Sequence, residues 1–308
     1  MSLYQYLRPN GPSGFGYGST AAEVSEGLSL AGKTILLTGC NSGLGQETLR
    51  VLGQRGARVV ATARTLEKAR AACALHPGST VPLACELSDP ASVRSCAAEV
   101  KRSSLRLDAV ICNAGIMALP TLERAQGIEL QLFTNHVGHF LLVTELLDQI
   151  TSDGRVVVLS SEAHQRAPEG GIEFDNLSGE RGYQAWTAYG QSKFANLLFA
   201  KELARRFAGT RRTANAVHPG VIRTNLGRHM SPVARFVFGL AGPIVLKSVP
   251  QGAATQVYAA VHPAVAGISG AYLADCNIAK CRPDAEDPAL GARLWQVTEE
   301  IVARLPAG

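Results

Sequence analysis

The stretch that decides the fold runs from Lys33 to Gly45 and reads KTILLTGCNSGLG. A short apolar run ends at Gly39, and apolar residues at helical spacing begin at Leu44. This order predicts a buried strand, a tight glycine turn and the first turn of a helix. The spacing is Gly-x-x-x-Gly-x-Gly: Gly39 permits the turn, Gly43 lets the backbone approach a ligand, and Gly45 lets helix and strand pack closely.

A helix that starts after such a loop attracts phosphate, because its first amides and its dipole favour negative charge. We therefore predict a dinucleotide site whose loop residues are Gly39, Asn41, Ser42, Gly43, Leu44 and Gly45. At the end of the second predicted strand, Asp or Glu would indicate NAD, whereas this sequence has Ala63 followed by Arg64. The planar guanidinium of Arg64 can bind a 2′-phosphate, which favours NADP(H) over NAD, although a plain surface arginine is the alternative interpretation.

The alternation of strand and helix continues along most of the chain. Short apolar runs predict strands at 33–38, 57–62, 80–85, 107–112, 155–159, 213–218 and 270–274, and helical patterns separate them at 44–52, 66–75, 89–102, 128–150, 183–207 and 250–261. This pattern predicts an α/β fold, a single-domain Rossmann-type doubly wound parallel sheet of about seven strands with helices on both faces. We assign residues 1–30 to an extended lead-in, 31–308 to the domain, and about 223–248 to an apolar substrate loop.

Composition excludes several classes of protein. The chain has 308 residues, of which 46% are hydrophobic and 18% charged, and this balance excludes disorder. No apolar stretch is long enough for a membrane span, and residues 1–19 lack the apolar core of a signal peptide. The net charge of +5 is spread thinly, so we expect no nucleic-acid partner. Seven scattered cysteines without a Cys-x-x-Cys motif favour free thiols in a reducing compartment, which predicts a cytoplasmic location.

Tyr189 and Lys193 stand four positions apart at the start of a predicted helix, so the phenol and the ammonium share one face. Because a neighbouring cation favours the phenolate, we expect Lys193 to lower the pKa of Tyr189 and suit it to proton transfer. Ser160 and Ser161 follow the predicted strand 155–159, and strand ends line the ligand crevice in such sheets. Taken singly, a Tyr-x-x-x-Lys pair is common, and a serine pair more often caps a helix.

Together and in this order, these residues resemble the short-chain dehydrogenase/reductase family over roughly Leu30 to Leu305. The resemblance rests on residues 38–45, Cys112-Asn113-Ala114-Gly115, Asn135, Ser161, Tyr189 with Lys193, and Pro219-Gly220. NHVGHF at 135–140, SSEAH at 160–164 and SKFAN at 192–196 are similar to the retinol dehydrogenase-like branch. The lead-in and LADC at 273–276 resemble plant dehydrogenases associated with the chloroplast translocon, and WW-domain oxidoreductases share the core.

The resemblance implies a role for each matching residue. Tyr189 would be the general acid or base, Lys193 would hold the nicotinamide ribose, Ser161 would orient the carbonyl oxygen, and Asn135 would hold a water. The remaining implied cofactor contacts are Glu86 and Leu87 at the adenine, Asn113, Ala114 and Gly115 at the adenosine ribose, and Pro219, Gly220, Val221 and Thr224 at the nicotinamide end. Glu86 stands where the family usually has Asp, and its longer side chain makes that contact the least typical.

The implied activity is NADP(H)-dependent hydride transfer between nicotinamide and a lipophilic ketone, aldehyde or alcohol. The apolar loop at 223–248 suits such a substrate, while a core helix, peripheral membrane contact and homo-oligomerisation remain open. The alternative function is an NADP(H)-sensing scaffold that docks to a membrane-associated complex. A sugar-nucleotide epimerase is disfavoured by the glycine spacing. His136 and His139 lack a third ligand in a known pattern, so no metal site is predicted.

Overall fold

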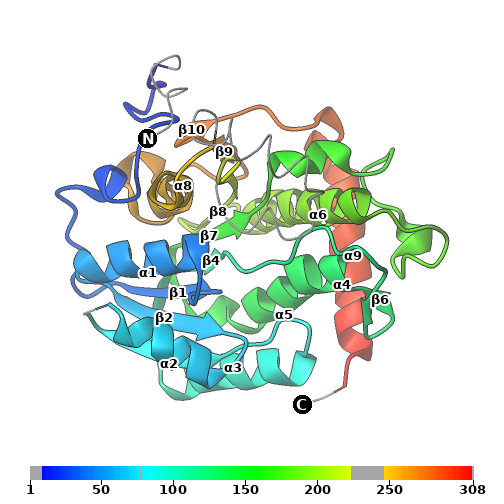
Figure 1. Ribbon diagram of the computed structural model, residues 1–308, viewed down its shortest axis with the longest axis horizontal. Coiled ribbons are helices and arrows are strands. Elements are labelled where there is room, and N and C mark those ends of the chain that lie inside the picture. The colour runs from blue at the N-terminus through cyan, green and yellow to red at the C-terminus, as the bar shows by residue number, and fades with distance from the viewer. Residues whose placement is uncertain (1–8, 77, 223–245, 307–308) are drawn as a thin grey trace.

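The computed structural model describes residues 9–76, 78–222 and 246–306. Eight strands form one sheet in the order β10-β9-β8-β7-β4-β1-β2-β3, in which only β10 runs antiparallel to its neighbour (Figure 1). The strands are β1 (Thr34–Thr38), β2 (Arg58–Ala63), β3 (Thr80–Ala84), β4 (Leu107–Cys112), β7 (Ile150–Leu159), β8 (Thr213–His218), β9 (Tyr272–Ala274) and β10 (Asn277–Ile278). The doubly wound parallel sheet is thus confirmed. The eighth strand, β10, was not predicted, because two residues are too few to show a periodic pattern.

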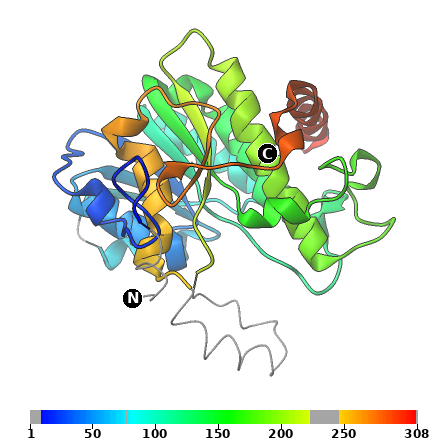
Figure 2. The same cartoon turned by 90° about the horizontal axis from the view of Figure 1, so that it is seen from above.

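Helices cover both faces of the sheet. One face carries α1 (Gly43–Gln54), α2 (Leu66–Ala74) and α8 (Val249–Val261), and the other carries α3 (Pro90–Arg102), α5 (Gly138–Glu145), α6 (Ala185–Arg206) and α9 (Pro288–Arg304). Figure 2 shows α8 and α9 on opposite sides of the strands. Leu36 belongs to the core cluster on the side of α3, α5 and α6, whereas its neighbours Ile35 and Leu37 belong to the cluster on the side of α1 and α8. Because both sets are buried, the strands appear in the sequence as continuous apolar runs.

Polar side chains fix where several helices begin. Asp89 accepts a hydrogen bond from Ala91 N at 3.0 Å, and Pro90 starts α3, as the sequence predicts. Ser248 and Gln251 form a reciprocal capping box at the start of α8. Short 3-10 helices occupy the connections: η2 (Glu23–Ser25), η4 (Leu147–Gln149), η5 (Glu162–Arg166), η6 (Phe174–Asn176), η8 (Pro263–Val265) and η9 (Pro283–Glu286).

The single helix predicted over 128–150 is wrong. A small hairpin of β5 (Arg124–Ala125) and β6 (Ile128–Glu129) comes first. Glu129 then caps α4 (Leu130–Leu132) by accepting a hydrogen bond from Leu132 N at 2.7 Å, so the helix begins only after the hairpin. A five-residue π-helix, Phe133–Val137, then separates α4 from α5. Apolar spacing does not distinguish an α turn from a π turn when the whole segment is buried. The π turn contains Asn135, one of the predicted site residues.

The lead-in, expected to be extended, forms turns and the helix η2, and it packs against α8. The Phe15 ring meets the Tyr258 ring edge to face, with centroids 5.7 Å apart. Ala21 N donates to Pro250 O at 2.9 Å, and Asn277 Nδ2 donates to Phe15 O at 3.0 Å. The lead-in around Phe15 therefore lies beside β10, although Phe15 and Asn277 are 262 positions apart in the sequence.

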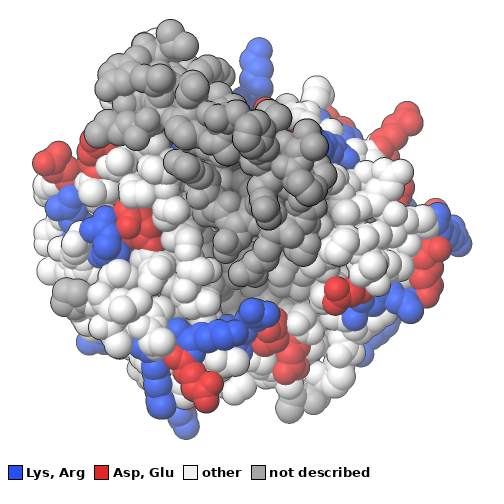
Figure 3. Space-filling view, in the orientation of Figure 1, with Lys and Arg blue, Asp and Glu red and all other residues white. Residues whose placement is uncertain are grey.

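Charge, thiols and hydropathy add three findings. Lys and Arg are interspersed with Asp and Glu over the described part of the face in Figure 3. All seven cysteines are free thiols, and only Cys281 is not fully buried. Within the described ranges, no helix combines the length and apolar character that a membrane crossing demands. The cytoplasmic location stays a prediction.

Candidate active site

The glycine loop packs so tightly at Gly39 and Gly45 that these two positions suit only glycine. Gly39, directly after β1, has a φ of +70°, which favours glycine. A Cβ on Gly45 would lie 1.9 Å from the carbonyl oxygen of Gly39. Ser42 precedes α1 but makes no side-chain capping bond to the helix amides. The start of α1 therefore keeps the donors that an anion would use.

The end of β4 holds the glycine loop in place. Asn113 Nδ2 donates to Thr38 O at 2.7 Å, and Thr38 Oγ1 accepts from the amides of Asn113 and Ala114 at 2.9 and 3.0 Å. Gln256, on α8, donates to Asn113 Oδ1 at 3.1 Å. The predicted residues Asn113 and Ala114 thus lie against the loop. The hydrogen bonds by which Thr38 and Gln256 hold them there were not predicted from the sequence.

Tyr189, Lys193 and Ser161 come together where α6 crosses the end of β7. Lys193 Nζ lies 5.7 Å from the centroid of the Tyr189 ring and donates to Leu159 O at 3.0 Å. The Ser161 hydroxyl lies near the phenol of Tyr189, where it lowers the phenol pKa, and it accepts from Ala163 N at 3.1 Å. Ser160 instead donates to the carbonyl of Lys193 at 2.7 Å and is fully buried. The geometry therefore favours Ser161 over Ser160 as the serine that meets a ligand.

Asn135 and Gly115 complete the same cluster. Asn135 is fully buried; its Oδ1 accepts from Ile116 N at 2.8 Å, and its Nδ2 donates to Ser192 Oγ at 2.9 Å. A Cβ on Gly115 would lie 3.0 Å from Asn135 Oδ1 and 3.4 Å from Lys193 Nζ. The glycine therefore lets the segment after β4 pass beside both polar groups.

Burial shifts the proton affinities of the two titratable groups in this cluster. It raises the pKa of Tyr189 to about 12, against a smaller lowering by the nearby Ser161 hydroxyl. It lowers the pKa of Lys193 to about 8. The sequence prediction that Lys193 lowers the pKa of the phenol is thus wrong, because desolvation of the phenol dominates and raises that pKa. Near neutral pH, Tyr189 carries its proton and Lys193 is mostly charged.

His139 links the two halves of the site, a role that the sequence did not reveal. Its Nε2 lies 2.9 Å from Thr38 Oγ1, and its Nδ1 lies 2.9 Å from Asn135 O. Since Thr38 Oγ1 already accepts two amides, its proton goes to Nε2, and Nδ1 of a neutral imidazole donates to Asn135 O. Burial lowers the pKa of His139 to about 4, which agrees with the neutral form.

Acid should destabilise the protein through its buried histidines. Burial lowers the pKa of His136 to about 3 and of His139 to about 4, so the unfolded state binds more protons below pH 6.5. Stability contributed by each neutral imidazole is present above pH 6.5 and is lost as the pH falls toward its folded pKa, by roughly 1 kcal/mol per pH unit. Urea unfolding at pH 7 and pH 5 measures the loss. If the free energy of unfolding fell by the same amount between pH 7 and pH 5 in His139→Gln as in the wild type, His139 would not contribute to the acid sensitivity.

The remaining described site residues follow the ends of β2, β3 and β8. Arg64 directly follows β2, is exposed, and has no hydrogen bond or ion pair within the described part of the chain. Glu86 accepts from Ser88 Oγ at 2.9 Å, and Leu87 is buried. Pro219, Gly220 and Val221 follow β8. Thr224, like residues 223–245 of the predicted substrate loop, lies outside the described residues.

One further aromatic residue lies next to the phenol. Trp186 is 44% exposed, and its ring meets that of Tyr189 edge to face with centroids 6.1 Å apart. Trp186 precedes Tyr189 by three positions in α6, so helical spacing from a suspected catalytic tyrosine could have identified it. No group of three or more His, Cys, Asp or Glu among the described residues is arranged to hold a metal ion.

Comparisons with known proteins identify the family. The family model for the short chain dehydrogenase matches residues 33–233. Short-chain dehydrogenase TIC 32 B, chloroplastic, from Brassica napus is 39% identical, with 96% of this chain and 97% of that protein covered. Retinol dehydrogenase 14 from Homo sapiens is 38% identical, over 89% of this chain and 87% of that protein.

Solved structures share the fold. A crystal structure of an uncharacterized protein from Mycobacterium paratuberculosis is 34% identical with a TM-score of 0.76, over 92% of this chain and 98% of that one. The angucycline C-6 ketoreductase LanV with bound NADP has a TM-score of 0.63 at 24% identity, over 80% of this chain and 95% of that one. With the family model and two relatives at 38–39% identity across most of the chain, this protein belongs to the short-chain dehydrogenase/reductase family of oxidoreductases and resembles its retinol dehydrogenases.

Proposed function

We propose that the protein is an NADP(H)-dependent oxidoreductase that transfers a hydride between the nicotinamide and a lipophilic ketone, aldehyde or alcohol. The observation that carries the proposal is the cluster of Tyr189, Lys193 and Ser161 with Asn135, beside the glycine loop. Proximity and close packing join its members: Ser161 lies near the phenol, and Gly115 packs against both Asn135 and Lys193. A rate of NADPH oxidation that depends on added carbonyl compounds, such as aromatic and long-chain aldehydes, tests it.

The residues present fit a dinucleotide carrying a 2′-phosphate. The loop between β1 and α1 has no room for a side chain at Gly45, and the uncapped start of α1 offers amides to a pyrophosphate. Arg64, directly after β2, has a guanidinium that no described residue engages and that suits a phosphate dianion. Bound there, the nicotinamide would supply or accept the hydride.

The chain's own groups handle the carbonyl oxygen and its proton. The Ser161 hydroxyl donates a hydrogen bond to that oxygen and orients it toward Tyr189. Tyr189, protonated at neutral pH, gives its proton to the oxygen as negative charge develops there. The Lys193 ammonium stabilises the phenolate that remains, and the buried Asn135 keeps the adjacent backbone in place. Oxidation of an alcohol reverses these steps.

Exposed apolar side chains on α6 and after β8 support a lipophilic substrate. Trp186 lies edge to face with Tyr189, and Val221, after β8, is 46% exposed. Apolar side chains left in water at a catalytic centre gain free energy when a ligand covers them. The alternative, a cofactor-sensing scaffold, is not favoured, because it requires none of the proton-transfer geometry at Tyr189.

Replacing Arg64 by alanine tests the cofactor preference. If the guanidinium binds the 2′-phosphate, Arg64→Ala should raise the Kd for NADPH about 10- to 100-fold, as expected for loss of a charge-assisted hydrogen bond. The Kd for NADH, which lacks that phosphate, should change less than about threefold. Fluorescence titration with both cofactors measures the two values.

Arg58→Ala is the matched control, since Arg58 is an exposed arginine at the opposite end of the same strand. It should leave both affinities unchanged. Equal weakening of NADPH and NADH binding in Arg64→Ala would contradict the 2′-phosphate contact and leave only a general electrostatic effect.

A further inference from the structure

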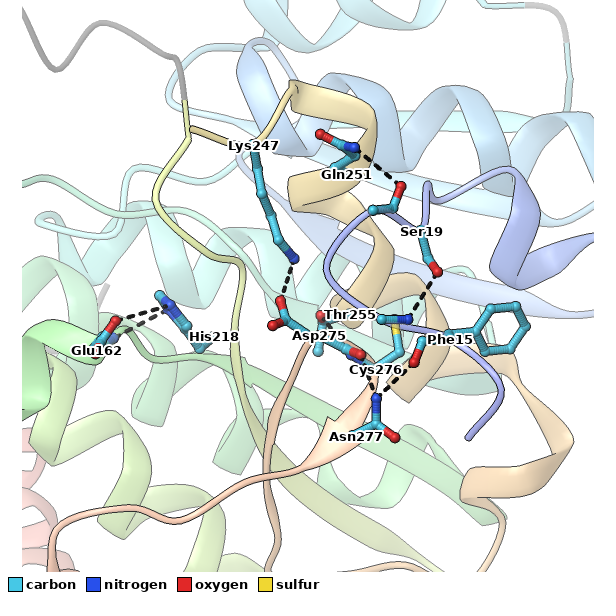
Figure 4. Close-up of polar contacts among 12 residues, drawn as sticks. Phe15, Ser19, Glu162, His218, Lys247, Gln251, Thr255, Asp275, Cys276 and Asn277 are labelled. Atoms are coloured by element: carbon cyan, nitrogen blue, oxygen red, sulfur yellow. Dashed lines mark hydrogen bonds and ion pairs between the residues drawn. The ribbon is translucent and has the colours of Figure 1, made fainter. Parts of the chain in front are cut away.

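A lysine is buried directly beneath the turn that follows β8. Lys247 is fully buried, and its Nζ forms an ion pair with Asp275 Oδ1 at 2.5 Å (Figure 4). Its methylene chain fills the space at Gly220, where a Cβ would lie 2.6 Å from Lys247 Cδ. Its backbone amide donates to Val221 O at 2.9 Å, and Lys247 pairs with Ile222 in an isolated bridge. Lys247 therefore contacts the 220–222 segment through both its backbone and its side chain.

The partner carboxylate is held on a strained turn. Asp275 and Cys276 connect β9 to β10, and both have positive φ, +51° and +61°. This is a two-residue hairpin turn, in which Asn and Gly are the usual residues. Cys276 N donates to Thr255 Oγ1 at 3.2 Å, which ties the turn to α8. The structure therefore maintains two uncommon backbone conformations at the point that presents Asp275 to Lys247.

The lead-in closes this region from outside. The Tyr17 ring lies 4.9 Å from Lys247 Nζ in a cation–π contact. Gln251 Nε2 donates to Gly18 O at 3.1 Å, and Asn277, next to the turn, bonds to Ser13 and Phe15. The lead-in thus packs against both Lys247 and the turn that carries Asp275, and Figure 4 shows Phe15 bonded to Asn277 beside that turn.

A gain in folding stability does not explain the buried ion pair between Lys247 and Asp275. Burying an ammonium costs several kcal/mol, and a well-packed apolar pair in its place is often neutral or stabilising. Left-handed backbone at non-glycine residues adds a further cost. A feature that is unfavourable on both counts is better explained by what it positions. Here that is the Gly220–Val221 peptide, which follows the strand next to the one that carries Ser161.

We propose that the Lys247–Asp275 ion pair is a positioning device that sets the Gly220–Val221 peptide, and through it the nicotinamide half of bound NADP(H). This inference rests on the proposed function, because it needs bound NADP(H) and takes residues 219–221 as the contacts that the family resemblance implies for the nicotinamide end. Lys247 and Asp275 are positioning residues that act through the peptide. The adenosine half, held by the glycine loop and Arg64, should not depend on them.

The double variant Lys247→Met/Asp275→Asn tests the proposal. It removes both charges together, and asparagine tolerates the left-handed conformation at 275. We expect the Kd for NADPH to rise about tenfold or more, because the Gly220–Val221 peptide would no longer be held in the position that the nicotinamide needs. The Kd for 2′-phospho-ADP-ribose, which lacks the nicotinamide, should stay within about twofold. Thermal unfolding should remain cooperative, and Lys247→Arg, which keeps the charge, should bind NADPH as the wild type does.

The ion pair between Lys201 and Glu286 provides the control. Lys201 is also buried, lies 2.8 Å from Glu286, and belongs to α6, on the other face of the sheet. Lys201→Met/Glu286→Gln should leave both affinities unchanged. Equal weakening of NADPH and the fragment by the Lys247 double variant, or no weakening of either, would overturn the positioning role. A wild type that binds neither ligand would instead refute the proposed function itself.

Discussion

Tyr189→Phe should lower kcat for carbonyl reduction by about 10²- to 10⁴-fold, the range expected when a general acid is removed. The ring stays, so its packing against Trp186 is kept and only the hydroxyl that meets Ser161 is lost. Binding of NADPH should therefore change less than about twofold. Stopped-flow measurement of NADPH oxidation, together with fluorescence titration of NADPH, separates the two quantities.

Tyr258→Phe is the matched control, because Tyr258 is a buried tyrosine that packs on the lead-in and His262. It should turn over at close to the wild-type rate. Should Tyr189→Phe reduce a good substrate as fast as the wild type, the proton must come from another group, and the role assigned to Tyr189 is wrong.

Gly45→Ala should destabilise the protein by about 3 kcal/mol, at the upper end of ordinary overpacking. The added methyl would lie 1.9 Å from the carbonyl oxygen of Gly39 and 2.7 Å from Asn113 Nδ2. Neither backbone nor Asn113 can yield easily, because Asn113 is held by hydrogen bonds to Thr38 and Gln256. The loop must open, so NADPH binding should be lost as well. Urea unfolding and cofactor titration measure both effects.

Gly291→Ala provides the comparison for Gly45→Ala. Gly291 is also inside a helix, α9, but the nearest atom to an added Cβ belongs to the end of the flexible Arg205 side chain. Alanine there should be neutral or stabilising by up to about 1 kcal/mol, because it is the better helix former. If both alanines had the same effect, close packing of the glycine loop could not be the cause of the loss at Gly45.

Most of the sheet was predictable because each strand is a local apolar run. The bounds of β4 and β8 agree with the sequence prediction residue for residue, and α3 begins at Pro90, directly after its capping Asp89. The hairpin before α4, the π turn at Asn135 and β10 were not predicted. These elements are short or fully buried, and hydrophobic periodicity carries little information about either.

The sequence by itself determined the fold class, the glycine loop and the identity of Tyr189, Lys193, Ser161 and Asn135 as candidates, because those signals depend on spacing along the chain. Only the tertiary structure decided the proton affinities and the supporting contacts. Burial raises the pKa of Tyr189, against the lowering expected from a nearby lysine, since desolvation depends on everything packed around the ring. The contacts of His139 with Thr38, and of Lys247 with Asp275, join segments that no local pattern connects.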